Sequence, residues 1–354
     1  MEIKTPVKEW QDIKEVSKSG RSIRFTAFLV KILPHTLLIG LTKVVTLFYF
    51  AATKWARKFS REYQNNLIEF SKNLPDYLEG TDLSHLPSRP NAYRHIASFA
   101  TCLVEKIEGW SGKSSMKNIE FAGEQERLEH ARGTGANGTQ PYTSSTDLET
   151  VRNLLRSGKG CMLICSHLGN IELFRSIFSY GSDDFDHIIP VSIIMDQKVT
   201  QNFNSILGKL NSNARLNVIS SDDISMATMS QLQDTIDQGG LVVISADRLP
   251  AHNAQRSLEI SFLGKSAKLP YGPFLIAALL NCPTYFIFSM RKHQTGFDPT
   301  YIVNIIKSGV SFDGGRKERE SKIAELAGEY TRLLEKFCLM YPYQWYNFYG
   351  YWSS

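Results

Sequence analysis

The sequence predicts an α/β fold with a mainly parallel central sheet and flanking helices, preceded by a hydrophobic helical region at the N-terminus. Three observations support this prediction: five short apolar runs between residues 161 and 306, helical patterns between them, and a basic N-terminal segment that encloses a long hydrophobic stretch. Continuous apolar runs such as GLVVISA are typical of parallel strands that are covered on both faces.

The positive charge of the chain is concentrated at its N-terminus. Residues 1–61 contain 12 basic and 4 acidic residues, a net charge of +8, whereas the remainder contains 28 basic and 31 acidic residues, a net charge of −3. A nucleic-acid-binding protein would carry this excess on a folded surface. Here it encloses a hydrophobic stretch, which indicates anionic lipid headgroups as the partner and no nucleic acid.

The hydrophobic stretch covers residues 25–52 and is long enough to cross a bilayer, which takes about 20 residues. Lys31, Pro34, His35 and Lys43 interrupt it, and no small-residue cleavage site follows, so a secretory signal peptide is not expected. As one helix it would be amphipathic, which favours attachment in the membrane plane or at a steep tilt. A true span and a buried hairpin of core helices are the alternatives.

We therefore expect a membrane-attachment region over residues 1–61 and a catalytic domain over residues 62–354. The beginning of that domain shows a helical pattern up to about residue 112, interrupted where Pro87 and Pro90 break any regular element. Residues near 123–145 are polar and are interpreted as a loop.

The remainder alternates between strand and helix. A capping box of Thr146 and Glu149 predicts the start of a helix that ends at SGKG. Strands are expected at 161–165, 188–194, 241–246, 284–289 and 301–306, and helices near 171–180, 199–211, 222–237 and 270–281. This alternation favours the α/β class.

Composition excludes several other classes of protein. The 354 residues are 42% hydrophobic and 21% charged, and a mean hydropathy of −0.21 is far from that of a polytopic membrane protein. Five cysteines without a CxxC pair indicate neither a disulfide framework nor a structural zinc site. Cys161 and Cys165 lie on the same face of a predicted strand and are expected to pack as small hydrophobic residues.

A candidate catalytic histidine follows the first of these strands, in GCMLICSHLGNIELF. His167 lies just beyond the carboxyl end of the strand, where open α/β sheets bind ligands, and Asn170 is a plausible N-cap of the next helix. Glu172 would lie in the first turn of that helix and could bond to the imidazole. A carboxylate so placed fixes the tautomer of the ring and makes its other nitrogen a competent base.

This His-x4-Glu pattern at a strand-to-helix turn resembles the acyltransferase motif of the lysophospholipid acyltransferase superfamily. The chain is similar in particular to the bacterial lipid A biosynthesis acyltransferases, which load lauroyl or myristoyl chains. Four further segments carry the resemblance, which spans roughly residues 25–352: the hydrophobic stretch at 25–52, GLVVISADRLP with Asp247, SFLGKSAKLPYGPFLIAALLNCPTYFIFSMRK at 261–292, and the terminal YPYQWYNFYGYW.

The resemblance implies an acyltransferase-type fold and an enzyme at the cytoplasmic face of a bacterial inner membrane, bound peripherally or by a single pass. It would move a fatty acyl chain from acyl carrier protein or acyl-CoA to a hydroxyl of a lipid or glycolipid, with His167 as general base and Glu172 orienting it. The oxyanion would be held by backbone N–H groups near Gly169 and Asn170. Neither a cofactor nor a metal is expected. Further substrate-binding candidates are Asp247, Arg248, Gly264, Lys265, Lys268 and Arg291, and the basic mouth for the donor would consist of Lys265, Lys268, Arg291 and Lys292.

One position departs from the family. Where lipid A acyltransferases place an Arg after the second strand, this chain has Met195 and Asp196, and Lys198 is the nearest cation. Arg248 could supply the charge from another loop. Because Lys does not bind phosphate bidentately as Arg does, a less phosphorylated glycolipid, an aryl polyene lipid or an amino-acid lipid is compatible as acceptor.

Other interpretations of the same residues stay open. Asp247 could cap or orient a loop instead of entering the chemistry, and the lysines near Gly264 could be a solvated loop. The aromatic tail is expected to pack in the core or to anchor at a membrane interface. The alternative functions are a catalytically inactive lipid-binding protein of the same fold, and an esterase or thioesterase that uses the same base to activate water.

Overall fold

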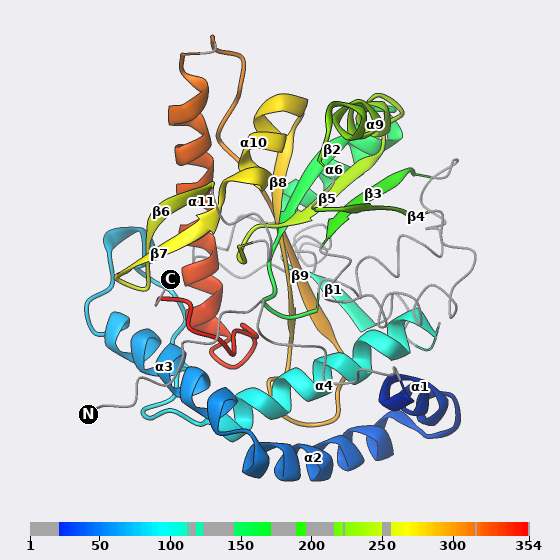
Figure 1. Cartoon of the computed structure of the whole chain (residues 1–354), viewed down its shortest axis with the longest axis vertical. Coiled ribbons are helices and arrows are strands. Elements are labelled where there is room, and N and C mark those ends of the chain that lie inside the picture. The colour runs from blue at the N-terminus through cyan, green and yellow to red at the C-terminus, as the bar shows by residue number, and fades with distance from the viewer. Residues whose placement is uncertain are drawn as a thin grey trace, which may run out of the picture.

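A seven-stranded, mostly parallel sheet forms the centre of the molecule (Figure 1). The computed structural model describes residues 21–111, 113, 118–122, 145–170, 189–195, 216–221, 224–249, 256–315 and 317–352. The strand order is β1-β9-β8-β2-β5-β3-β4, and only β9 and β1, at one edge, run against the others. The strands are β1 (Ile119–Phe121), β2 (Cys161–Cys165), β3 (Val191–Met195), β4 (Leu216–Ser220), β5 (Leu241–Ser245), β8 (Thr284–Arg291) and β9 (Tyr301–Lys307).

The five strands predicted from apolar runs are confirmed as β2, β3, β5, β8 and β9, with ends that differ by at most three residues. β1, β4 and a separate antiparallel hairpin were not predicted. The hairpin pairs β6 (Ser257–Phe262) with β7 (Lys265–Pro270) through a two-residue turn at Leu263 and Gly264, both with positive φ. Such turns match the twist of the strands they join and usually have Asn, Asp or Gly in the first position. Because this turn has a leucine there, the sequence pattern did not predict it.

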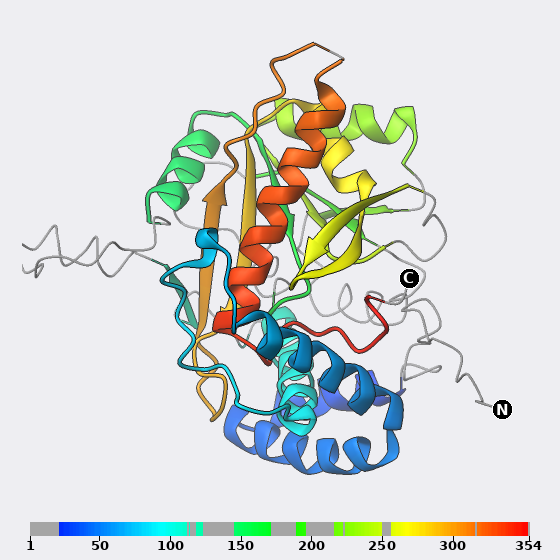
Figure 2. The same ribbon diagram turned by 90° about the vertical axis from the view of Figure 1, so that its left-hand side faces the viewer.

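Helices cover both faces of the sheet, as Figure 2 shows from the side. α9 (Met226–Asp237), α10 (Tyr271–Leu280) and α11 (Arg319–Met340) pack on one face, and α6 (Ser145–Arg156) packs on the other. These confirm the helices predicted near 222–237 and 270–281 and after Thr146. Those predicted near 171–180 and 199–211, the Thr146 side chain and the polar loop up to residue 144 lie outside the described residues.

Successive residues of β2 point to opposite faces, so that Cys161 and Cys165 are buried on the α6 side and Met162 and Ile164 on the α11 side. The prediction that both cysteines pack as small hydrophobic residues is confirmed. Burial raises the pKa of the Cys161 thiol, which opposes formation of a thiolate nucleophile.

The N-terminal hydrophobic stretch forms two helices and not one. α1 (Arg21–Ile32) ends before Pro34, and α2 (His35–Ala52) begins after it. Proline disfavours a helical conformation in the residue before it, which explains the break. α3 (Lys54–Phe70) follows directly, so that the expected regional boundary after Arg61 falls inside a helix. A short 3-10 turn, η2 (Asp76–Leu78), and α4 (Ala92–Trp110) complete this part.

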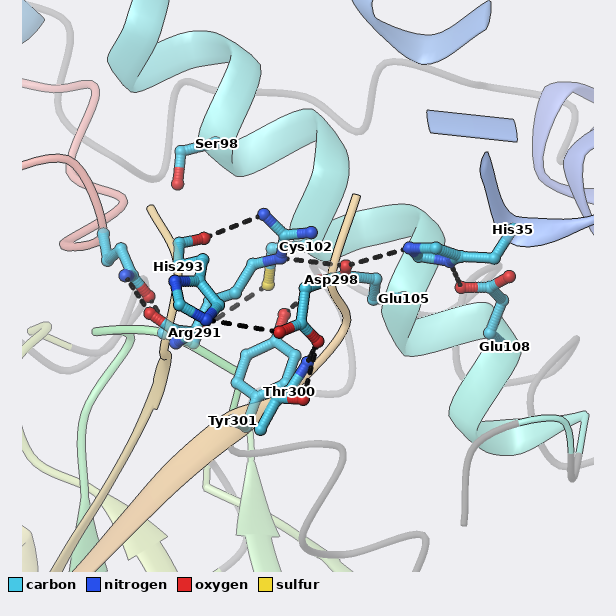
Figure 3. A network of polar contacts seen from close by, with 12 residues as sticks. His35, Ser98, Cys102, Glu105, Glu108, Arg291, His293, Asp298, Thr300 and Tyr301 are labelled. Atoms are coloured by element: carbon cyan, nitrogen blue, oxygen red, sulfur yellow. Dashed lines mark hydrogen bonds and ion pairs between the residues drawn. The ribbon is translucent and has the colours of Figure 1, made fainter. Parts of the chain in front are cut away.

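α4 joins the N-terminal helices to the sheet. On one side its Val104 and Ile107 pack with Val30, Leu38 and Ile39 of α1 and α2. On the other side a buried polar network reaches β8 and β9, as Figure 3 shows. The Nε of Arg291 lies 3.0 Å from a Glu105 carboxylate oxygen, and the hydroxyl of Tyr301 donates to the other oxygen.

The network extends to the first residue of α2. His35 Nδ1 lies 2.7 Å from Glu108, and its Nε2 lies 3.8 Å from Glu105. Burial by itself lowers the pKa of His35, but the hydrogen bond to Glu108 and the two negative charges outweigh burial and the opposing Arg291, so that the pKa is raised. These carboxylates favour the protonated form of His35, whose hydrogen bond to Glu108 ties α2 to α4.

The raised pKa sets a pH dependence of stability. The contribution of His35 to the free energy of unfolding is complete below its pKa in the unfolded chain, about 6.5. It is lost as the pH rises through the pKa of His35 in the folded protein. His35→Gln should therefore lower the free energy of unfolding by about 1.5–3 kcal/mol at acidic pH and by less at alkaline pH, because a hydrogen bond to a charged group disappears.

Urea unfolding at a series of pH values measures this difference. His293→Gln is the control, because His293 forms an exposed ion pair with Asp298 and such pairs contribute at most about 1 kcal/mol. A loss for His35→Gln that grows with pH would contradict the assignment.

Candidate active site

His167 and Asp247 meet at the carboxyl ends of two neighbouring parallel strands. β2 and β5 are in register so that Cys165 pairs with Ser245, and each of the two side chains comes two residues further along its strand. His167 Nδ1 lies 2.7 Å from one carboxylate oxygen of Asp247, and the backbone N–H of His167 donates to the other at 2.9 Å. The acid that orients His167 in the structure therefore comes from the adjacent strand.

Asp247 is completely buried, whereas the side chain of His167 is 36% exposed. Burial by itself raises the pKa of Asp247, but the neighbouring imidazole, Arg248 and the hydrogen bonds it accepts outweigh burial and lower it. Asp247 is thus ionised and can only accept hydrogen bonds. The proton of a neutral imidazole must then be on Nδ1, which leaves the lone pair on Nε2.

The pKa of His167 is lowered from its ordinary value. Burial is the main cause, the positive charges of Arg248 and of Lys106 on α4 add to it, and Asp247 opposes them. His167 is consequently neutral near pH 7. Its Nε2 has no hydrogen-bond partner among the described residues, so the ring carries an available base that is partly open to solvent.

The loop after β2 is held by close backbone contacts. Gly169 has a φ of +73°, and a Cβ added to it would lie 1.9 Å from the carbonyl oxygen of Ser289. The Gly169 N–H donates to the carbonyl of Gln344, and the Asn170 N–H donates to that of Ser289, both at 2.8 Å. The expectation that these two N–H groups bind an oxyanion is therefore wrong, because both already have partners.

The C-terminal tail completes the site, a role that the sequence did not reveal. The indole N–H of Trp345 donates to Asp247 at 3.1 Å. The side chain of Gln344 accepts from the N–H of Arg291 and donates to its carbonyl, which clamps the end of β8. Trp345 is only 1% exposed, so that the core-packing interpretation of the aromatic tail holds for this residue. The one signal in the sequence was the YPYQWY segment itself.

His95 of α4 holds this tail from the other side. Its Nε2 donates to the carbonyl of Trp345 at 2.8 Å, and the ring is fully buried against Ser60. Burial lowers the pKa of His95 to about 4, so the imidazole is neutral. It acts as a structural donor, because its ring has no exposed surface to offer a substrate.

The other predicted site residues lie in different surroundings. Asn170 is completely buried, and Arg248 donates to the carbonyl of Tyr346 beside the site. Gly264 and Lys265 lie at the tip of the hairpin, where the ammonium group of Lys265 donates to Asn66 of α3. Lys268 lies opposite Glu259 in the backbone register of the hairpin.

Two of the four cations of the predicted basic mouth are paired with carboxylates of the chain. Arg291 is buried and paired with Glu105, and Lys292 forms an ion pair with Glu120 at 2.7 Å. These cations are already neutralised by carboxylates of the chain, so they do not present a free docking surface. Glu172, Asp196 and Lys198 lie outside the described residues, and the orienting role of Glu172 stays a prediction.

Among the described residues, no group of three or more His, Cys, Asp or Glu side chains is arranged to hold a metal ion. No protein-family model matches the sequence, and no curated protein matches it. The functional inference therefore depends on the residues of the site.

The close approach at Gly169 gives a test of the loop. Gly169→Ala should lower the free energy of unfolding by about 2–4 kcal/mol, because it combines the strain of a positive φ with a steric overlap that the backbone cannot relieve. Gly158→Ala is the matched control, since Gly158 has a φ of +72° but no atom near its added Cβ. Denaturant unfolding measures both variants. An equal loss of unfolding free energy in Gly169→Ala and Gly158→Ala would contradict the close contact at Gly169.

Proposed function

We propose that the protein is an acyltransferase that moves a fatty acyl chain from an acyl thioester to a hydroxyl of a lipid or glycolipid acceptor. The observation that carries the proposal is a neutral imidazole at a strand end, with Nδ1 fixed by a buried carboxylate and Nε2 available. The resemblance of the His167 segment, the Asp247 segment and the tail to lipid A biosynthesis acyltransferases supports the same chemistry.

The geometry suits general base catalysis. Nε2 of His167 takes the proton of the acceptor hydroxyl as its oxygen attacks the thioester carbonyl carbon, and Asp247 stabilises the resulting imidazolium. Collapse of the tetrahedral intermediate breaks the C–S bond, and the imidazolium returns the proton to the leaving sulfur. The products are an ester and a free thiol, and no covalent acyl-enzyme is needed.

Asp247 takes the orienting role in this proposal, because it occupies Nδ1. Glu172 remains the second predicted carboxylate of the motif. The acceptor is a membrane lipid and the donor is acyl carrier protein or acyl-CoA, at the cytoplasmic face of a bacterial inner membrane. The Arg248 guanidinium, next to the base, is the candidate partner for an anionic group of either substrate.

His167→Ala should reduce acyl transfer by about 10²–10⁴-fold, the usual contribution of a general base. Asp247→Asn should cause a similar loss, because an amide that donates to Nδ1 would put the ring proton on Nε2. Transfer from a radiolabelled acyl thioester to membrane lipids measures both, and circular dichroism checks that each variant is folded.

The exposed pair His293 and Asp298 provides the matched control, and His293→Ala and Asp298→Asn should retain activity. Glu172→Gln reports whether the second carboxylate contributes. Full transfer by His167→Ala would refute the proposal, and free fatty acid as the sole product of the wild type would make the protein a hydrolase.

The lowered pKa of His167 predicts the acidic limb of the pH profile. The base works only when neutral, so kcat/KM should fall as the pH drops through a value below about 6.5. Arg248→Gln and Lys106→Gln each remove a positive charge that lowers this pKa, so both should move the limb to higher pH. A shift toward lower pH would contradict the electrostatic assignment.

A further inference from the structure

We propose that α1 and α2 dock in the plane of an anionic lipid bilayer, and that α2 does not cross it. This inference rests on the membrane association contained in the proposed function and states how the protein meets its membrane. It stands on the exposure, charge and contacts of the N-terminal helices.

An apolar surface covers the outer side of α1 and α2, the outermost elements at one end of the molecule in Figures 1 and 2. Of the fifteen large hydrophobic side chains that are exposed among the described residues, nine belong to these two helices. On α2 they recur with helical spacing along one face. The nine are Phe25, Phe28, Ile32, Leu37, Leu41, Val44, Val45, Leu47 and Phe48, between 44% and 72% exposed. Such concentration marks an interaction surface.

Positive charge lies next to this surface. The chain has eight basic residues and no acidic residue between Arg21 and Arg61. Lys54, Lys58 and Arg61 are exposed on α3 and line a shallow depression of about 570 Å³. Cations beside an apolar face fit anionic headgroups above acyl chains. A second copy of the chain would bring like charges together, which disfavours a dimer through this face.

The inner side of α2 is bound to the folded domain along its length. His35 at its N-terminus bonds to Glu108, the backbone carbonyl of Lys43 accepts from the hydroxyl of Tyr93, and the ring of Phe50 packs edge-on against Tyr93. A spanning α2 would leave α4 and abandon these contacts, and the buried carboxylates of Glu105 and Glu108 would lose a cation.

The polar groups of α2 do not oppose burial of its apolar side in lipid. The hydroxyls of Thr42 and Thr46 donate to the carbonyls four residues earlier, so that they need no partner from water. Arg57 of α3 donates to the last carbonyls of α2, those of Phe50 and Ala51. The C-terminal end of α2 therefore carries a cation, which lies with Lys54 and Lys58 of α3.

This docking places the active site near the membrane. α4 lies between the apolar surface and the carboxyl ends of the strands, and the thiol of Cys102 on α4 contacts the carbonyl of Gly169 at 3.5 Å. The charge of Lys106, one turn further along α4, acts on His167. The end of the molecule that faces the bilayer is thus the end that carries the base, which suits an acceptor drawn from the lipid layer.

Flotation of the purified full-length protein with vesicles tests the docking surface. We expect binding to phosphatidylcholine vesicles that contain phosphatidylglycerol and weaker binding to phosphatidylcholine alone. Leu41→Asp with Phe48→Asp should abolish binding, whereas the control Leu279→Asp with Met226→Asp changes residues elsewhere that are at least as exposed and should not. Lys54→Glu with Lys58→Glu should weaken binding to anionic vesicles at least about tenfold, unlike Lys159→Glu with Lys317→Glu.

Topology is tested with epitope tags at residues 1 and 354 in inverted inner-membrane vesicles treated with protease. In-plane docking leaves both tags accessible, and a protected N-terminal tag would show that α2 spans and overturn the inference. Unchanged vesicle binding of Leu41→Asp with Phe48→Asp, or self-association through this face without lipid binding, would also overturn it.

Different variants test the docking proposal and the proposed acyltransferase function, so that either can fail without the other. The Leu41→Asp with Phe48→Asp variant should still acylate an acceptor presented in detergent micelles, because His167 and Asp247 are unchanged. His167→Ala should still float with anionic vesicles, because the docking surface is unchanged.

Discussion

The buried carboxylate of Asp247 is the constraint on which the site depends. It accepts hydrogen bonds from the His167 side chain, the His167 backbone and the Trp345 indole, and so joins β2, β5 and the C-terminal tail at one point. An ionised carboxylate without these donors would be costly to bury. The same bonds that offset this cost fix the tautomer and the direction of the imidazole, so that stability and the geometry of the proposed base come from one set of contacts.

The C-terminal tail has the second essential role. Gln344 clamps the end of β8, and its carbonyl accepts from the N–H of Gly169, while His95 holds the carbonyl of Trp345. The loop that carries His167 is therefore framed by β8, the C-terminal tail and α4, which are far apart in the sequence. A site held by such distant segments is preorganised, because no single segment can move without breaking contacts in the others.

A second buried charge cluster, around Glu105, connects the N-terminal helices to the sheet. Arg291 of β8 and His35 of α2 both approach the same carboxylate oxygen of Glu105. This cluster explains why Arg291 cannot serve as a free cation for a donor, and why α2 is held against the domain with its apolar side outward. The edge of the sheet that carries His167 and the proposed membrane surface are therefore linked through α4.

The sequence by itself determined the five apolar strands, the helix over residues 270–281, the packing of Cys161 and Cys165, and the position of His167 beyond a strand end. All of these depend on the local periodicity of apolar residues. It also showed the basic, hydrophobic character of the N-terminal stretch and the position of Pro34, whereas the structure showed that this proline divides the stretch into α1 and α2. Only the tertiary structure decided that Asp247 reaches His167, that Trp345 supports it and that Arg291 is buried against Glu105. Strand order and register bring together residues 80 or more positions apart, and a short window of sequence contains no record of that pairing.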